Sequence, residues 1–139
     1  MIKSSILVVD DVVNNLELLE EILDDTGYEV RTALSGEMAL KSIAVQKPDL
    51  ILLDIMMPGI DGYKTCEMIK KEESLADIPI IFLSAKSEAE DKVKGFELGA
   101  VDYLPKPFEV VEVPARLQTH LSMYNLQREL NRSLKMMED

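Results

Sequence analysis

The sequence has one cysteine, no tryptophan and few positive charges, with 15 Lys and Arg against 26 Asp and Glu. A lone cysteine, Cys66, excludes an intramolecular disulfide and favours a reducing, cytoplasmic setting. The net charge of −11 opposes attraction to the phosphates of nucleic acid or to anionic lipids. No apolar run approaches the roughly 20 residues that span a bilayer, and no signal peptide precedes the first acidic residues. We therefore expect no direct nucleic-acid binding and no membrane association.

The apolar residues follow a pattern typical of βαβ units. Among 139 residues, 47% are apolar, which is enough for one buried core. Short runs of branched side chains alternate with segments of helical spacing, about five times along the chain. This pattern predicts an α/β fold with a parallel sheet covered by helices on both faces. The expected strands are Ile6–Val9, Tyr28–Ala33, Leu50–Leu53, Ile80–Ser84 and Asp102–Leu104.

Residues that favour helix ends stand where the helical segments should begin and finish. Asn14, Ser35 and Ser87 are N-cap candidates, and Gly27 and Gly99 are candidates for helix termination. The expected helices are Asn14–Thr26, Gly36–Gln46, Gly62–Lys71, Glu88–Leu98 and a last one that begins at Phe108 or Glu109.

The last helical segment is longer than a helix that only covers a sheet. From Glu109 to the end there is one proline, near the start, and no glycine, so a continuous helix of about 45 Å can form. Two interpretations of its distal part remain open: a frayed amphipathic tail, or the first heptads of a coiled coil that leads to a partner subunit or a downstream domain. We therefore divide the chain into a domain, residues 1–121, and a helical extension, residues 122–139. The proposed a and d positions are Met123, Leu126, Leu130, Ser133 and Met137.

Polar side chains follow four of the five predicted strands. Asp10 and Asp11 follow the first strand, Asp54 the third and Lys106 the fifth, and Ser84 ends the fourth. The carboxyl ends of parallel strands meet at one edge of a sheet, where ligands bind in open α/β folds. Three carboxylates at one edge repel one another unless a hard cation compensates their charge, so this set favours a Mg²⁺ site. A lysine and a serine hydroxyl can bind phosphate oxygens beside it.

Each of these side chains also has a simpler structural role when taken alone. An Asp pair favours a helix N-terminus, an Asp before Pro58 opens a turn, a serine caps a helix and a lysine is usually solvated. All four simple roles would have to coincide at the ends of four strands. The set as a whole therefore favours a functional site.

Four segments together resemble the receiver domain of two-component response regulators. They are ILVVDD at 6–11, LILLDIMMPGIDG at 50–62, IIFLSA at 80–85 and GAVDYLPKPF at 99–108. The resemblance covers residues 4–121. It implies a flavodoxin-like, doubly wound sheet of five parallel strands in the order 2-1-3-4-5 with five helices, the last extended at its C-terminus.

The resemblance also implies a phosphorylation-dependent signalling switch. Such a domain accepts a phosphoryl group from a histidine kinase or a phosphotransfer protein, with Mg²⁺ as cofactor, and catalyses its own phosphorylation and slow dephosphorylation without being a conventional enzyme. The implied site residues are Asp54 as phosphoacceptor; Asp10, Asp11, Asp54 and the backbone carbonyl of Met56 as metal ligands; Ser84 and Lys106 as phosphate contacts; Ser84 and Tyr103 as switch residues; and Lys106 and Pro107 joined by a cis peptide.

Partners and rival functions follow from the same resemblance. We expect a histidine kinase partner, a downstream output domain, and self-association through the last helix or through the face of the fourth helix, fifth strand and fifth helix. The main alternative is a phosphorylation-independent protein-interaction module that keeps the fold. An aspartate-nucleophile phosphohydrolase is disfavoured, because Val12 and Met56 stand where its second aspartate would be. We expect His120 to have a surface or linker-facing role.

Overall fold

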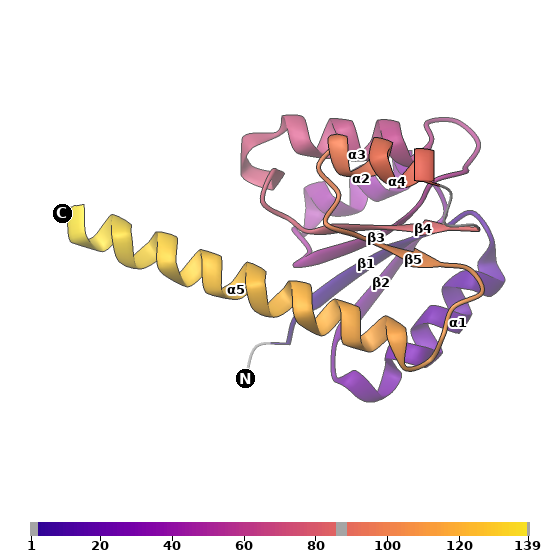
Figure 1. Ribbon diagram of the computed structural model, residues 1–139, viewed down its shortest axis with the longest axis horizontal. Helices are drawn as coiled ribbons and strands as arrows, with labels where there is room; N and C mark the ends of the chain where they lie inside the picture. The colour runs from indigo at the N-terminus through magenta and orange to yellow at the C-terminus, as the bar shows by residue number, and fades with distance from the viewer. Residues whose placement is uncertain (1–2, 86–88, 139) are drawn as a thin grey trace.

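Five short strands form one parallel sheet in the order β2-β1-β3-β4-β5, which confirms the expected topology (Figure 1). The computed structural model describes residues 3–85 and 89–138. Every residue of β1, β3 and β4 is buried, as their nearly continuous apolar sequences predict. The strands are β1 (Ser5–Val9), β2 (Glu29–Ala33), β3 (Leu50–Asp54), β4 (Ile80–Ser84) and β5 (Asp102–Pro105).

Helices cover both faces of the sheet. In Figure 1, α1 and α5 lie on one face and α2, α3 and α4 on the other. Each face has its own apolar core, because successive side chains of a strand point to opposite sides. None of the helices within the described ranges is both long and apolar enough to cross a membrane. The helices are α1 (Val13–Leu23), α2 (Gly36–Val45), α3 (Gly62–Lys71), α4 (Ala89–Glu97) and α5 (Glu112–Glu138), with short 3₁₀ turns η1 (Asp24–Thr26) and η2 (Glu73–Leu75).

The helix ends follow the sequence signals in most places. Ser35 caps α2 by accepting the N–H of Met38, and Gly27 and Gly99 adopt the left-handed conformation at φ 82° and 104°. The prediction that Asn14 caps the first helix is wrong. That helix begins at Val13, because a hydrogen bond from the N–H of Val12 to the side chain of Asp10 turns the chain just before it. The predicted cap Ser87 lies outside the described residues.

Only the first half of α5 packs against the sheet. Its inward face ends at Tyr124, and the side chains at 125–137 are all exposed. Arg128 still reaches back, with its Nη1 3.1 Å from Asp49 Oδ1, before the helix runs beyond the sheet (Figure 1). The boundary at residue 121 stays a prediction, although contacts with the domain continue to Arg128.

The exposed half of α5 carries an apolar stripe. It includes Leu134, which the expected a and d positions omit in favour of Ser133. Successive members are separated by 3, 4, 4 and 3 residues, so the stripe spans two heptads, and only Leu134 departs by one residue from the strict heptad order. We call this set the distal stripe; its members are Met123, Leu126, Leu130, Leu134 and Met137.

Candidate functional site

The carboxyl edge of the sheet brings the predicted acidic residues together. Asp10 directly follows β1 and Asp54 is the last residue of β3; both side chains are buried, whereas Asp11 is exposed. One carboxylate oxygen from each of the three lies within 4.8 Å of the other two. This proximity follows from the pairing of β1 with β3, which places the ends of the two strands side by side.

Asp10 is fixed by bonds to the start of α1. Its Oδ1 accepts the N–H of Val12 at 2.9 Å, and its Oδ2 accepts Nδ2 of Asn15 at 3.1 Å. These bonds turn the chain into the helix and explain why Asn14 has no capping role. Sequence reasoning missed Asn15; a polar amide in the first helical turn after two aspartates was the available signal.

Lys106 provides the positive charge at this edge. Its Nζ lies 3.0 Å from Asp54 Oδ1 and 3.2 Å from Asp10 Oδ2. Its backbone N–H donates to the backbone carbonyl of Ser84 at 2.7 Å. Burial lowers the pKa of the lysine, but the hydrogen bonds and charges of Asp54 and Asp10 outweigh it and raise the pKa overall. The peptide bond between Lys106 and Pro107 is cis.

The surroundings of Asp54 destabilise the ionised form of its carboxyl group. Burial raises the pKa of this carboxyl to about 6; the charge of Asp10 adds to the effect, and Lys106 opposes it. The converging donors are carboxylate oxygens, which are the ligands that Mg²⁺ prefers. These residues therefore fit a magnesium ion, which would relieve the repulsion that one lysine leaves uncompensated.

We expect Asp54→Asn to raise the free energy of unfolding of the metal-free protein at pH 7. The expected gain is about 1–2 kcal/mol, a value already reduced for solvent screening of this carboxyl. The folded pKa of about 6 exceeds the ordinary 3.8, so the folded state binds the proton more tightly than the unfolded state. The penalty from Asp54 is present above pH 6 and disappears as the pH falls toward 4. Urea titrations of both proteins from pH 4 to 8 measure it.

The two stability profiles should converge near pH 4 and separate above pH 6. Other carboxylates titrate in both proteins, so the difference between the profiles isolates Asp54. A constant difference across this range would contradict the prediction. Adding Mg²⁺ at pH 7 should stabilise the wild type more than the variant.

Two contacts position the segment between β3 and α3. Glu37, at the start of α2, accepts the N–H of Ile60 at 3.0 Å, and this bond lowers the pKa of the glutamate. Gly62 donates its N–H to the carbonyl of Ile55 at 2.8 Å and packs against the backbone of Asp54. The sequence analysis assigned no site role to Glu37 or Gly62. Both residues act on the backbone of the segment that follows Asp54, and not through a side chain that contacts the acidic residues.

Ser84 and Tyr103 lie beside the acidic edge. Ser84 ends β4 in register with Pro105, and its side chain is buried. Tyr103 is only 5% exposed, with its ring centroid 5.9 Å from that of Phe82 and 5.8 Å from that of Phe96. Both residues line a cavity of about 250 Å³ between α4 and α5. The tyrosine ring therefore points inward.

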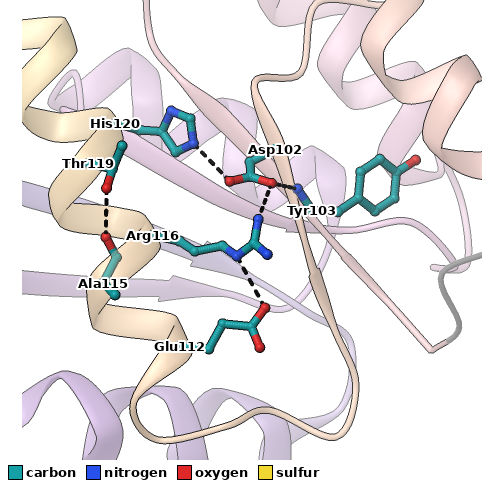
Figure 2. Close-up of polar contacts among 7 residues, drawn as sticks. All are labelled: Asp102, Tyr103, Glu112, Ala115, Arg116, Thr119 and His120. Carbon is teal, nitrogen blue, oxygen red and sulfur yellow. Dashed lines mark hydrogen bonds and ion pairs between the residues drawn. The ribbon is translucent and has the colours of Figure 1, made fainter.

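A polar cluster ties β5 to α5 (Figure 2). Asp102 accepts Nη1 of Arg116 at 2.6 Å and the N–H of Tyr103 at 2.7 Å, and its other oxygen lies 2.9 Å from Nε2 of His120. Burial acts to raise the pKa of Asp102, but the bonds from His120, Tyr103 and Arg116 lower it overall. The expectation of a surface or linker-facing role for His120 is wrong: it is partly buried against Asp102. The four-residue spacing of Arg116 and His120 predicts that they share one face of the helix. It does not predict that this face meets Asp102 of β5.

A doubly wound sheet with three carboxylates and a lysine at its carboxyl edge defines a class of α/β domain built around one acidic site. The family model for the response regulator receiver domain matches residues 6–118, and the chain belongs to this family. The identification made from the sequence motifs is thereby confirmed.

Similar proteins include a curated transcriptional regulator and two solved structures. The chain is 47% identical over 116 residues to the alkaline phosphatase synthesis transcriptional regulatory protein PhoP of Bacillus subtilis (strain 168), covering 84% of this chain and 48% of that protein. It thus spans about half the length of the curated relatives it matches. A solved response regulator from Chloroflexus aurantiacus J-10-fl superposes with TM-score 0.84 at 41% identity, covering 87% of this chain and 99% of the other. NtrX from Brucella abortus gives TM-score 0.87 at 33% identity, covering 94% of this chain and 29% of NtrX.

Proposed function

We propose that this domain is a phosphorylation-dependent switch of a two-component system, with Asp54 as the phosphoacceptor. The contact of Lys106 Nζ with both Asp54 and Asp10 carries the proposal, because it places one cation between the acceptor and its acidic neighbour. A carboxylate oxygen of Asp54 attacks the phosphorus of a phosphohistidine, the P–N bond breaks, and an acyl phosphate forms. Lys106 offsets the negative charge on the transferred group.

Asp10, Asp11, Asp54 and the carbonyl of Met56 are the proposed ligands of Mg²⁺. When bound, the ion supplies charge compensation and orients a phosphate oxygen. The buried Asp10 is held rigid by Val12 and Asn15, so the carboxylate is preorganised for a cation. The exposed Asp11 leaves this side of the site open to water and to a phosphodonor.

The proposed signal starts at Ser84. A phosphoryl group on Asp54 adds about −1.5 to −2 of charge and three acceptor oxygens. The hydroxyl of Ser84 donates to one of them, and the space beside its loop is filled by Tyr103 in the active state. Stabilisation of the inward tyrosine then changes the face formed by α4, β5 and α5, where the cluster around Asp102 lies.

The surface around Asp54 suits a helical protein partner, which we propose is a histidine kinase or phosphotransfer protein acting in the cytoplasm. Val13 at the start of α1, Met56 after β3, and Val110 and Val111 before α5 are exposed apolar residues near the acidic edge. Val110 also lines a cavity with Leu18 and Glu21, so the segment before α5 lies against the side of α1. An apolar patch around a charged centre is typical of a protein-docking surface.

The outputs that we propose are self-association and control of a downstream domain. The distal stripe faces solvent on the half of α5 that leaves the sheet, and it can pair with the same stripe of a second copy. Its length is short for an independent coiled coil, so the face of α4, β5 and α5 would have to contribute.

Intact mass after incubation with Mg²⁺ and acetyl phosphate tests the function. We expect a labile adduct of about 80 Da in the wild type, none in Asp54→Ala, and none when EDTA removes the metal. Size-exclusion elution of the same samples should show earlier elution for the phosphorylated protein alone.

The main alternative makes a different prediction. A phosphorylation-independent interaction module would show no adduct with acetyl phosphate or with a broad set of histidine kinases, and its elution would be the same with and without these donors. An adduct that persists in Asp54→Ala would show that another residue is modified and would contradict the proposed acceptor.

A further inference from the structure

Gly95 has no conformational reason to be a glycine. It lies inside α4, is buried, and is absent from the glycines with positive φ, which are Gly27, Gly59 and Gly99. Alanine favours a helix interior over glycine, since glycine loses more backbone entropy on folding. The reason for this glycine must therefore come from its tertiary neighbours.

The neighbours of Gly95 are two aromatic residues of the sheet. A Cβ added at this position would lie 2.7 Å from the hydroxyl oxygen of Tyr103, and 2.9 and 3.1 Å from Cδ2 and Cε2 of Phe82. Phe82 is fully buried in β4 and has no room to retreat. The tyrosine hydroxyl is the end of a longer side chain that can rotate outward, so Tyr103 would yield first.

The backbone of Tyr103 is held on its other side by α5. Asp102 accepts its N–H and is itself bound by Arg116 and His120 (Figure 2). The strand is thus fixed, and the tyrosine ring has mainly its χ1 rotation to adjust. Whether the ring lies inward then depends on the space above it in α4, which Gly95 leaves open.

We propose that Gly95 is a positioning residue for the switch: it admits the ring and hydroxyl of Tyr103 to their inward place, and any Cβ at this position shifts the tyrosine outward. The consequence for signalling rests on the proposed function of Tyr103 and Asp54. The packing itself is a property of the fold and does not depend on that function. The two parts can therefore fail separately.

Fluorine NMR of the full chain labelled with 3-fluorotyrosine tests the position of the ring. The chain has four tyrosines, and Tyr103→Phe assigns the resonance. In the wild type, a soluble gadolinium chelate should broaden the signals of the buried Tyr103 and Tyr124 less than those of the partly exposed Tyr28 and Tyr63. In Gly95→Ala, we expect the gadolinium-induced broadening of this signal to rise severalfold, whereas Glu97→Ala, an exposed substitution on the same helix, should leave it unchanged.

A double-mutant cycle in urea gives an independent readout. Gly95→Ala should lower the folded-to-unfolded ratio about tenfold when Tyr103 is present, and by less than about threefold in a Tyr103→Phe background, because that background lacks the nearest atom. A tyrosine that stays shielded in Gly95→Ala, or an equal penalty in both backgrounds, overturns the proposal. The double variant Gly95→Ala/Tyr103→Phe provides the comparison if the single variant is poorly folded.

Phosphorylation of the same variants separates the proposal from the proposed function. Gly95→Ala should still form the acetyl phosphate adduct, because Gly95 does not touch the carboxylates, but the phosphorylation-dependent shift in elution should shrink. A full elution shift in a variant whose tyrosine is exposed overturns the role of Gly95 in the switch. Failure of every variant and the wild type to form an adduct would remove the proposed function and leave the packing result standing.

Discussion

Lys106→Met is expected to slow phosphorylation of Asp54 by acetyl phosphate about 100-fold while tightening Mg²⁺ binding. The ammonium lies 3.0 Å from Asp54 and 3.2 Å from Asp10, so it offsets charge on the same carboxylates that a metal would bind. Its loss removes charge stabilisation from the transfer step. It also leaves the carboxylates without a competing cation, so a divalent ion gains more on binding.

Slower phosphorylation together with tighter Mg²⁺ binding distinguishes this role of Lys106 from simple unfolding of the variant. The time course of the mass adduct gives the rate, and calorimetric titration gives the Mg²⁺ affinity. Lys71→Met is a matched control, because Lys71 is exposed and pairs only with Glu67 among the described contacts. A variant with weaker Mg²⁺ binding together with slower phosphorylation would indicate a distorted site and contradict the prediction.

Gly62→Ala is expected to destabilise the protein by about 2–3 kcal/mol and to slow phosphorylation about 100-fold. A Cβ at this position would overlap the carbonyl oxygen of Asp54 and lie 2.8 Å from Cα of Ile55. Because these atoms are backbone, no rotamer relieves the overlap. The first turn of α3 must move away from the end of β3, and the phosphoacceptor moves with it.

Gly27→Ala is the matched control for this prediction. Gly27 has φ 82° and no atom within 4 Å of an added Cβ, so alanine there introduces backbone strain without a clash. It should cost about 1 kcal/mol and leave the phosphorylation rate unchanged. Urea unfolding and the adduct time course measure both effects. Equal slowing in the two glycine variants would show that general destabilisation, and not displacement of Asp54, causes the loss.

The linear sequence carried most of the information about the sheet and the acidic edge. Uninterrupted apolar runs predicted β3 and β4, since a strand buried on both faces has no polar side to show. The positions of Asp10, Asp54 and Lys106 at strand ends predicted their convergence, because all strands of a parallel sheet finish at the same edge. Helix ends were predicted less accurately than strands. The expectation that Asn14 caps the first helix is wrong, because Asp10, a residue of the site, turns the chain instead.

What the sequence by itself determined was therefore what periodicity and strand ends encode: the alternating α/β pattern, one long last helix, and the residues of the acidic edge. Only the tertiary structure decided which helix face meets which strand. It paired His120 and Arg116 with Asp102, placed Gly62 on the backbone of Asp54, and set Gly95 against Tyr103. These contacts depend on differences of a few tenths of an ångström in how each helix packs against a neighbouring strand. Packing sets such distances, and no local pattern records them.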